Sequence, residues 1–269
     1  MKLTMRLRAF ALLLVLPVVF SPSSLAQGSK RAPAQRAAAR AQGEAVIMQQ
    51  MYGNYDARTK TSQWIKPTKA ALEMMGLNAG PLISRMGGAF PFQEGGNKKL
   101  LFVTWSVPRN FDCHGCSPLV SVAVFSQGAG KWEIEATESA LTTSGAWGAP
   151  GTFKLEQVGT ERFALVVNSA FTAQGQTSEA AFFYVREGAK FKQALVLNLQ
   201  EDNGGMCGAG GHVCYSYESK YAFQPKGTEP YYDLLVTATG TRLNDKGKVV
   251  KAKPKQTYVF KDGEYKPAS

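Results

Sequence analysis

The feature that most constrains the fold is a pattern of strands and hairpins that repeats between residues 100 and 267. Residues 100–106, 162–170 and 231–241 are three versions of one apolar strand, and each is followed by a loop and a hairpin. A glycine stands in the turn of every hairpin, where a positive φ is needed. These glycines are Gly130, Gly188 and Gly263. The pattern predicts a mostly β fold built from antiparallel meanders.

Two further alternating segments, residues 152–159 and 215–224, follow the first two hairpins and complete four-stranded meander repeats. In strand plan these repeats resemble the blades of a β-propeller, with a shorter third unit. The Asp-rich calcium loops of many repeat propellers are absent from the sequence. We therefore expect a partial, propeller-like arrangement, an open sheet array or a two-sheet sandwich.

Helical periodicity is confined to the region before residue 80. Residues 44–52 carry apolar side chains on one face, and a second helix is expected between Pro67 and Gly76, because proline suits a first turn and glycine a last one. The predicted organisation is a signal peptide (1–26), a flexible basic Ala-rich leader (27–43), a helical cap with a connecting segment (44–98) and a β-repeat domain (99–269).

The first residues have the composition of a secretory signal. Lys2, Arg6 and Arg8 precede an apolar run over residues 9–20, and small residues lead to a cleavage position after Ala26. That run is too short to span a bilayer, and no later apolar run approaches the ~20 residues that a spanning helix needs. The sequence predicts a periplasmic or secreted protein with no membrane span.

The chain is basic. Its formal charge is +11, and removal of the signal with its three basic residues leaves +8. A positive balance favours anionic partners and also keeps exported proteins soluble. No motif for specific nucleic acid recognition is present, so the partners that we expect are an anionic carbohydrate or an acidic protein.

All four cysteines and both histidines lie in two short loops, residues 112–116 and 206–214. In an exported chain they predict two disulfides, and the sequence alone permits three connectivities. Pairing between near neighbours, which meet first during folding, gives Cys113–Cys116 and Cys207–Cys214. The alternatives are a thiol–disulfide function or a zinc or copper site that adds His114 and His212 to the four thiolates.

Motifs for common catalytic machinery are missing: there is no Gly-x-Ser-x-Gly elbow, no His-Glu-x-x-His and no phosphate-binding glycine loop. Asp112, Glu201 and Asp202 are carboxylates beside the cysteine loops, where such groups are mostly solvated. The sequence therefore predicts a non-catalytic binding or accessory protein that uses no cofactor.

The meander order places the cysteine loops at one edge of the sheets. Residues 144–151, 171–179 and 242–255 arrive at the same edge, and long loops on a rigid scaffold commonly carry binding residues. The binding residues predicted there are Trp147, Lys248, Lys251 and Lys253.

Overall fold

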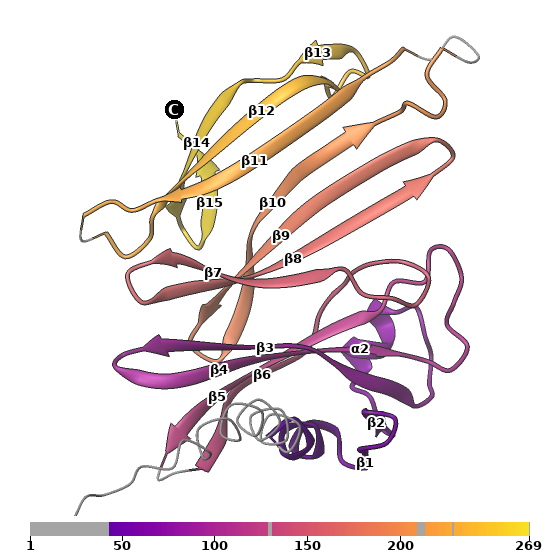
Figure 1. Cartoon of the computed structure of the whole chain (residues 1–269), viewed down its shortest axis with the longest axis vertical. Helices are drawn as coiled ribbons and strands as arrows, with labels where there is room; N and C mark the ends of the chain where they lie inside the picture. The colour runs from indigo at the N-terminus through magenta and orange to yellow at the C-terminus, as the bar shows by residue number, and fades with distance from the viewer. Residues whose placement is uncertain (1–42, 129–130, 209–212, 228, 269) are drawn as a thin grey trace, which may run out of the picture. The chain divides into compact units, whose positions relative to one another are not determined.

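The computed structural model describes residues 43–128, 131–208, 213–227 and 229–268. The chain divides into two compact units, residues 1–44 and 45–269, and the description below concerns the second unit. The predicted signal peptide, nearly all of the leader, His212 and the turn residue Gly130 lie outside the described residues. In the described part, two antiparallel sheets dominate the structure (Figure 1).

The first sheet has six strands in sequence order, and each strand pairs with the next in antiparallel fashion. The strands are β1 (Tyr55–Asp56), β2 (Thr61–Trp64), β3 (Leu82–Glu94), β4 (Asn97–Val107), β5 (Leu119–Gly128) and β6 (Lys131–Thr143).

The second sheet has nine strands in the order β15-β14-β12-β11-β10-β9-β8-β7, with β13 paired to β12. Its strands are β7 (Thr152–Gly159), β8 (Arg162–Ala173), β9 (Gln176–Glu187), β10 (Lys190–Asp202), β11 (Ser216–Gln224), β12 (Asp233–Leu243), β13 (Val249–Lys251), β14 (Lys255–Lys261) and β15 (Glu264–Pro267). Gly188 and Gly263 have φ values of +63° and +80° in their hairpin turns, as the sequence predicted.

The predicted fold class is confirmed: the chain is mostly β, its sheets are antiparallel and open, and its helices precede residue 80. Residues 45–52 are helical, and α2 spans Lys69–Met74. Thr68 caps α2 by accepting a 3.2 Å hydrogen bond from the Ala71 amide, and Gly76 follows the helix with φ +67°.

The boundary between the sheets differs from the predicted four-stranded units. We expected β7 to close a unit with β4, β5 and β6, but it pairs with β8 and begins the second sheet. The reason is the connection: only two residues separate β7 from β8, and Glu161 has the positive φ (+53°) of a tight hairpin turn. Residues 144–151 instead pass from one sheet to the other.

Strand β3 lies in the segment that we expected only to connect the helical cap to the strands. Gly87, Gly88 and Pro91 interrupt its alternation, and such residues weaken a strand prediction. The structure accommodates them with an irregularity in the pairing to β4 between Met86 and Gly88.

Buried clusters cover both faces of the second sheet. One lies between the sheets and joins apolar side chains of β4 and β5, such as Val103 and Val122, to Leu165 and Val167 of β8. The other lies on the opposite face of the second sheet and includes residues of both its edge regions. The Tyr265 hydroxyl of β15 donates a 3.4 Å hydrogen bond to the Val158 carbonyl of β7, so this sheet curls and brings its edge strands close together, although β15 and β7 do not pair.

The strand directions give the molecule two different ends. At the loop end lie residues 108–118, 144–151, 174–175, 203–208, 213–215 and 244–254, on the right in Figure 1. At the turn end lie residues 95–96, 160–161, 188–189, 225–227, 229–232 and 262–263. All the predicted site residues that the structure describes belong to the loop end or to the strand ends beside it.

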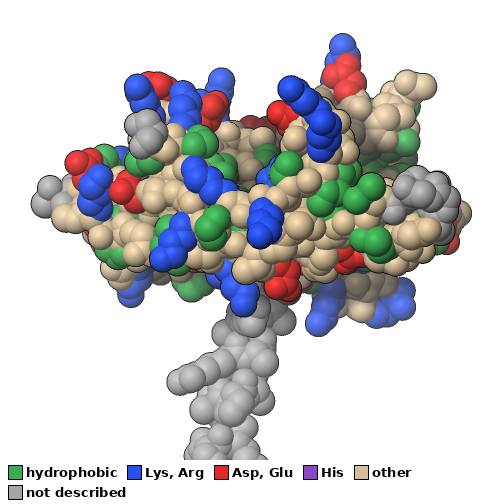
Figure 2. Space-filling model, turned by 90° about the horizontal axis from the view of Figure 1, so that it is seen from above, with side chains coloured by type: hydrophobic (Ala, Val, Ile, Leu, Met, Phe, Trp, Pro, Cys, Tyr) green, Lys and Arg blue, Asp and Glu red, His purple; other side chains and the backbone are tan. Residues whose placement is uncertain are grey.

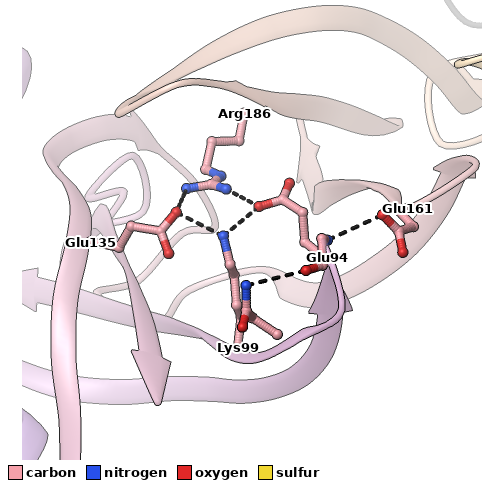
Figure 3. Close-up of polar contacts among 7 residues, drawn as sticks. Glu94, Lys99, Glu135, Glu161 and Arg186 are labelled. Atoms are coloured by element: carbon pink, nitrogen blue, oxygen red, sulfur yellow. Dashed lines mark hydrogen bonds and ion pairs between the residues drawn. The ribbon is translucent and has the colours of Figure 1, made fainter. Parts of the chain in front are cut away.

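The turn end contains a network of charges between the sheets (Figure 3). Lys99 Nζ lies 2.7 Å from Glu94 Oε2 and 2.8 Å from Glu135 Oε1, and all three residues belong to the first sheet. Arg186 of β9 pairs with the same two carboxylates and so links the second sheet to the first. The Gly95 amide also donates a 3.1 Å hydrogen bond to Glu161, which comes from the β7–β8 turn.

Candidate binding surface at the loop end

Three rings from three separate segments meet at the loop end. The His114 ring centroid lies 5.0 Å from that of Trp147 and 4.8 Å from that of Phe171, with interplanar angles of 41° and 24°. His114 Nε2 lies 3.0 Å from the Thr172 carbonyl oxygen, which fixes the ring against β8. We call His114, Trp147 and Phe171 the aromatic trio.

Two rings of the trio are exposed, and His114 is half-buried. Trp147 is 62% exposed and Phe171 is 40% exposed, although large apolar side chains usually lie inside a protein. A cluster of exposed aromatic rings commonly marks a binding surface, because each ring offers a large, rigid contact area. The sequence identified Trp147, and the structure adds His114 as a stacked ring and Phe171 as its second neighbour.

Backbone contacts hold the loop that carries Trp147. The Gly148 amide donates a 2.9 Å hydrogen bond to the Cys116 carbonyl, and Ala146 and Ala149 exchange two backbone hydrogen bonds across the turn. Trp147 itself has φ +55°, an uncommon conformation for a residue other than glycine. A Cβ atom on Gly148 would lie 1.9 Å from the Phe111 carbonyl oxygen, so the two loops approach each other too closely for a side chain there.

Disulfides close both cysteine loops. Cys113 pairs with Cys116 and Cys207 pairs with Cys214, with Cα–Cα distances of 5.0 and 4.9 Å. This is the local pairing that ease of formation favoured. Two disulfides indicate an oxidising compartment. A zinc or copper site on these loops would need thiolates, so it stays a prediction for the reduced protein. Among the described residues, no three potential metal ligands lie close enough together to hold a metal ion.

The second cysteine loop contacts the β8–β9 turn. The Gly205 amide donates a 3.0 Å hydrogen bond to the Gly175 carbonyl, and Gln176 Nε2 lies 3.2 Å from Met206 Sδ. Residues 171–176 are therefore contacted by both cysteine loops, by His114 on one side and by residues 205–206 on the other. The structure thus joins the two cysteine loops through the β8–β9 hairpin.

A hollow of about 350 Å³ lies beside the Trp147 loop. Gly145, Ala149 and Pro150 form one side of it, and Asn168 and Glu179 line the other. The Asn168 Oδ1 atom is buried and has no hydrogen-bond partner among the described residues. The hollow lies beside the loop that carries Trp147, and Glu179 brings a carboxylate to its lining.

The predicted lysines lie farther along the same end. Lys248, Lys251 and Lys253 are exposed in the segment between β12 and β14. In sheet order, β12 is four strands from β8, which corresponds to roughly 20 Å along the sheet at a strand spacing of about 4.8 Å. Seen from the side of β12 and β13, Lys and Arg side chains are spread over the surface between hydrophobic side chains (Figure 2). The lysines thus place positive charge at the same end of the sheet as the trio, but they do not contact it.

The carboxylates near this end have structural partners. Glu201 accepts a 2.5 Å hydrogen bond from Asn198 Nδ2, and Asp202 accepts a 2.9 Å hydrogen bond from the Gly204 amide in the turn after β10. Asp112 is exposed beside Cys113.

The sequence analysis missed a groove on the face of the second sheet that does not pack against the first sheet. We call this face the inner face, because the second sheet curls around it. The groove has a volume of about 350 Å³ and is lined by Tyr217, Arg242, Lys253 and Tyr258 among others. The signal was in the sequence: Leu234, Val236 and Ala238 alternate along the core-facing side of β12, and the same alternation continues to Arg242. An arginine in register with core residues is unusual at the end of a strand.

No helix in the described ranges is long and apolar enough to cross a membrane. Comparisons with protein-family models, curated proteins and solved structures find no match to this chain.

Proposed function

We propose that this chain is an exported, non-catalytic binding protein that presents its loop end to an anionic carbohydrate. The observation that carries the proposal is the aromatic trio, in which His114 lies between the exposed rings of Trp147 and Phe171. A disulfide closes the segment of His114, a backbone hydrogen bond joins that segment to the Trp147 loop, and the His114 ring joins it to β8. Such a surface is preorganised, so that little conformational entropy is lost on binding.

The chemistry of the surface suits a sugar polymer. Sugar rings have apolar faces that stack on exposed aromatic rings, and the neighbouring hollow adds the Glu179 carboxylate as an acceptor for hydroxyl groups. The formal charge of the chain and the exposed Lys248, Lys251 and Lys253 attract a polyanion over a longer range. In this division of roles, the trio supplies contact area and the lysines aid encounter.

The first test is binding of polygalacturonate by two variants. We expect Trp147→Ala to weaken binding by a factor of about 2 to 10, because a stacked ring contributes about 0.5–1.5 kcal/mol. The triple variant Lys248→Gln, Lys251→Gln, Lys253→Gln should slow association and reduce the salt dependence of binding. Both variants should unfold within about 0.5 kcal/mol of the parent, because these side chains are exposed.

Matched controls exist at the turn end. Ile134→Ala removes another exposed apolar side chain, and the triple variant Lys98→Gln, Lys190→Gln, Lys261→Gln makes the same change in charge there. Unchanged binding in both loop-end variants would exclude the loop end as the site. Equal binding to poly-glutamate, which has the charge without the rings, would instead point to an acidic protein partner.

A further inference from the structure

The groove on the inner face of the second sheet has the composition of a ligand site. Strand register places Tyr217, Ala238 and Arg242 on the same face of β11 and β12, because Tyr217 pairs with Gly240, and Ser219 pairs with Ala238. The same register places Gln256 and Tyr258 of β14 beside Val236 and Leu234. This face carries the buried cluster along most of its length, and the groove lies toward the loop end of it.

Its floor is apolar and its rim is basic. Leu197 and Val236 are 5% and 4% exposed at the floor, whereas Arg242 and Lys253 line the rim. In the described part of the chain, neither cation takes part in a salt bridge. The groove thus brings two cations together with apolar and aromatic side chains, and converging groups of this kind can bind a small molecule.

Arg242 is held in place by an aromatic ring. Its Cζ atom lies 5.5 Å from the centroid of Tyr217, which is only 6% exposed. A guanidinium on a ring face keeps the N–H groups at its edge available for a carboxylate, which it can bind through two parallel hydrogen bonds.

Tyr258 is the lining residue that best suits a sugar ring, because it is half-buried and combines an aromatic ring with a hydroxyl group. The amides of Asn198 and Gln256 also line the groove, where Asn198 donates to Glu201 and Gln256 accepts a hydrogen bond from Lys253. Burial and the neighbouring Tyr217 raise the pKa of Tyr258 against the opposing effect of Arg242, so its hydroxyl stays neutral and able to donate. The lining thus combines a cation for a carboxylate with a hydroxyl group and an aromatic ring for a sugar.

We infer that this groove binds the uronate residue of an acidic polysaccharide, with its carboxylate on Arg242 and its ring on Tyr258. The volume of about 350 Å³ suits a small ligand or the end group of a larger one. The inference rests on the proposed function, because it takes the ligand to be a carbohydrate. It adds a second contact to the same polymer, at the loop end of the inner face.

The test uses D-galacturonate, which is too small to reach from the groove to the aromatic trio. Titration followed by NMR should shift amide signals of β11, β12 and β14, and the uncharged methyl ester should bind at least about tenfold more weakly. Arg242→Gln should weaken galacturonate binding about tenfold or more. Arg242→Lys keeps the charge but loses the planar fork, so its loss should be smaller.

The matched control is Lys220→Gln, which removes one positive charge from the opposite face of β11 and should leave galacturonate binding unchanged. Two results would overturn the inference: no binding of galacturonate by the parent protein at millimolar concentration, or equal binding by Arg242→Gln. If polygalacturonate binding still depends on Trp147 in either case, the proposed function stands without this site. If polymer binding is also independent of Trp147, both fail.

Discussion

The two ends of the strands differ in what they bury and what they expose. At the turn end, Glu94, Lys99, Glu135 and Arg186 lie between the sheets with side chains only 11–30% exposed. At the loop end, Trp147 is 62% exposed. Charged side chains usually lie on the surface and large apolar ones inside, and this molecule has the reverse arrangement at each end.

We infer from this difference that the turn end contributes more to stability and the loop end more to binding. The turn-end network contains two carboxylates and two cations, and it joins residues of both sheets. The loop end has disulfides that span only 3 and 7 positions in sequence, and single hydrogen bonds, such as that between His114 and Thr172, join its loops to one another. A change at the turn end should therefore alter global unfolding, whereas a change at the loop end should alter the binding surface first.

The largest effect is expected from Arg186→Met. This substitution leaves Glu94 and Glu135 with Lys99 as their shared cation, in a partly buried site. Removing one partner of a fully buried ion pair costs about 3–5 kcal/mol, and because these groups are partly exposed we expect about 2–3 kcal/mol. Urea denaturation measures the loss, and polygalacturonate binding by the folded protein should be unchanged.

The control for this prediction is Lys69→Met, which breaks an exposed ion pair with Glu73. Such pairs along a helix contribute only about 0.3–0.5 kcal/mol. Equal losses in the two variants would mean that the network contributes no more than a surface pair, and the contrast between the ends would lose its energetic basis.

A smaller effect is expected from Gly148→Ala at the loop end. The added Cβ would meet the Phe111 carbonyl oxygen at 1.9 Å, and the residue would also keep φ +68°. We expect a loss of about 2 kcal/mol in unfolding free energy, because positive φ costs alanine about 1 kcal/mol and the clash adds to it. Binding of polygalacturonate should fall together with it, as the loop that carries Trp147 moves away from Cys116.

Gly188→Ala is the matched control at the turn end. Gly188 has a similar φ of +63°, but an added Cβ would have nothing within 4 Å. It should therefore lose only the conformational part, about 1 kcal/mol, and keep full binding. A Gly148→Ala variant that binds like Gly188→Ala would show that the close approach of residues 111 and 148 does not position the trio.

Much of the fold was predictable because it depends on local patterns. The alternation of apolar residues and the turn glycines Gly188 and Gly263 predicted antiparallel strands. Gly76 predicted the end of α2, but Pro67 lies before the helix and not in its first turn, because Thr68 is the cap. The division into sheets was not predicted, because it depends on whether β7 pairs with the strand that follows it, β8, or with the strand that precedes it, β6. The two-residue turn to β8 held that information, and its positive φ falls on Glu161 rather than on a glycine.

The site was predictable only in part. The meander order placed both cysteine loops and Trp147 at one end, and the structure has them there. The stacking of His114 on Phe171 was not predictable, because it depends on how the β4–β5 loop lies against β8. The groove was not predictable, because it forms only where the second sheet curls. The strand register places Arg242 on the core-facing side of β12, but it does not show that a hollow lies beside this residue.

The smallest effect concerns pH and the charge network. Burial alone would raise the pKa of Glu135, but hydrogen bonds from Lys99 and Arg186 outweigh it and hold that pKa below its usual 4.5. A lowered carboxyl pKa stabilises the fold above the unfolded value, and this contribution is lost as pH falls through the folded value. Lys99 has the opposite sign: burial lowers its pKa, hydrogen bonds to Glu135 and Glu94 raise it more, and its contribution is lost only at alkaline pH.

We therefore expect Glu135→Gln to be less stable than the parent at pH 7, and this difference to shrink at pH 3. Because Glu135 is 30% exposed at its side chain, the change between the two pH values should be no more than about 1 kcal/mol. Urea denaturation at both pH values measures it, and the control is Glu133→Gln, which makes the same change in charge at an exposed neighbouring position. A difference for Glu135→Gln that is the same at pH 7 and pH 3 would show that its ionisation does not hold the turn end together, and that the sheets are joined there by packing alone.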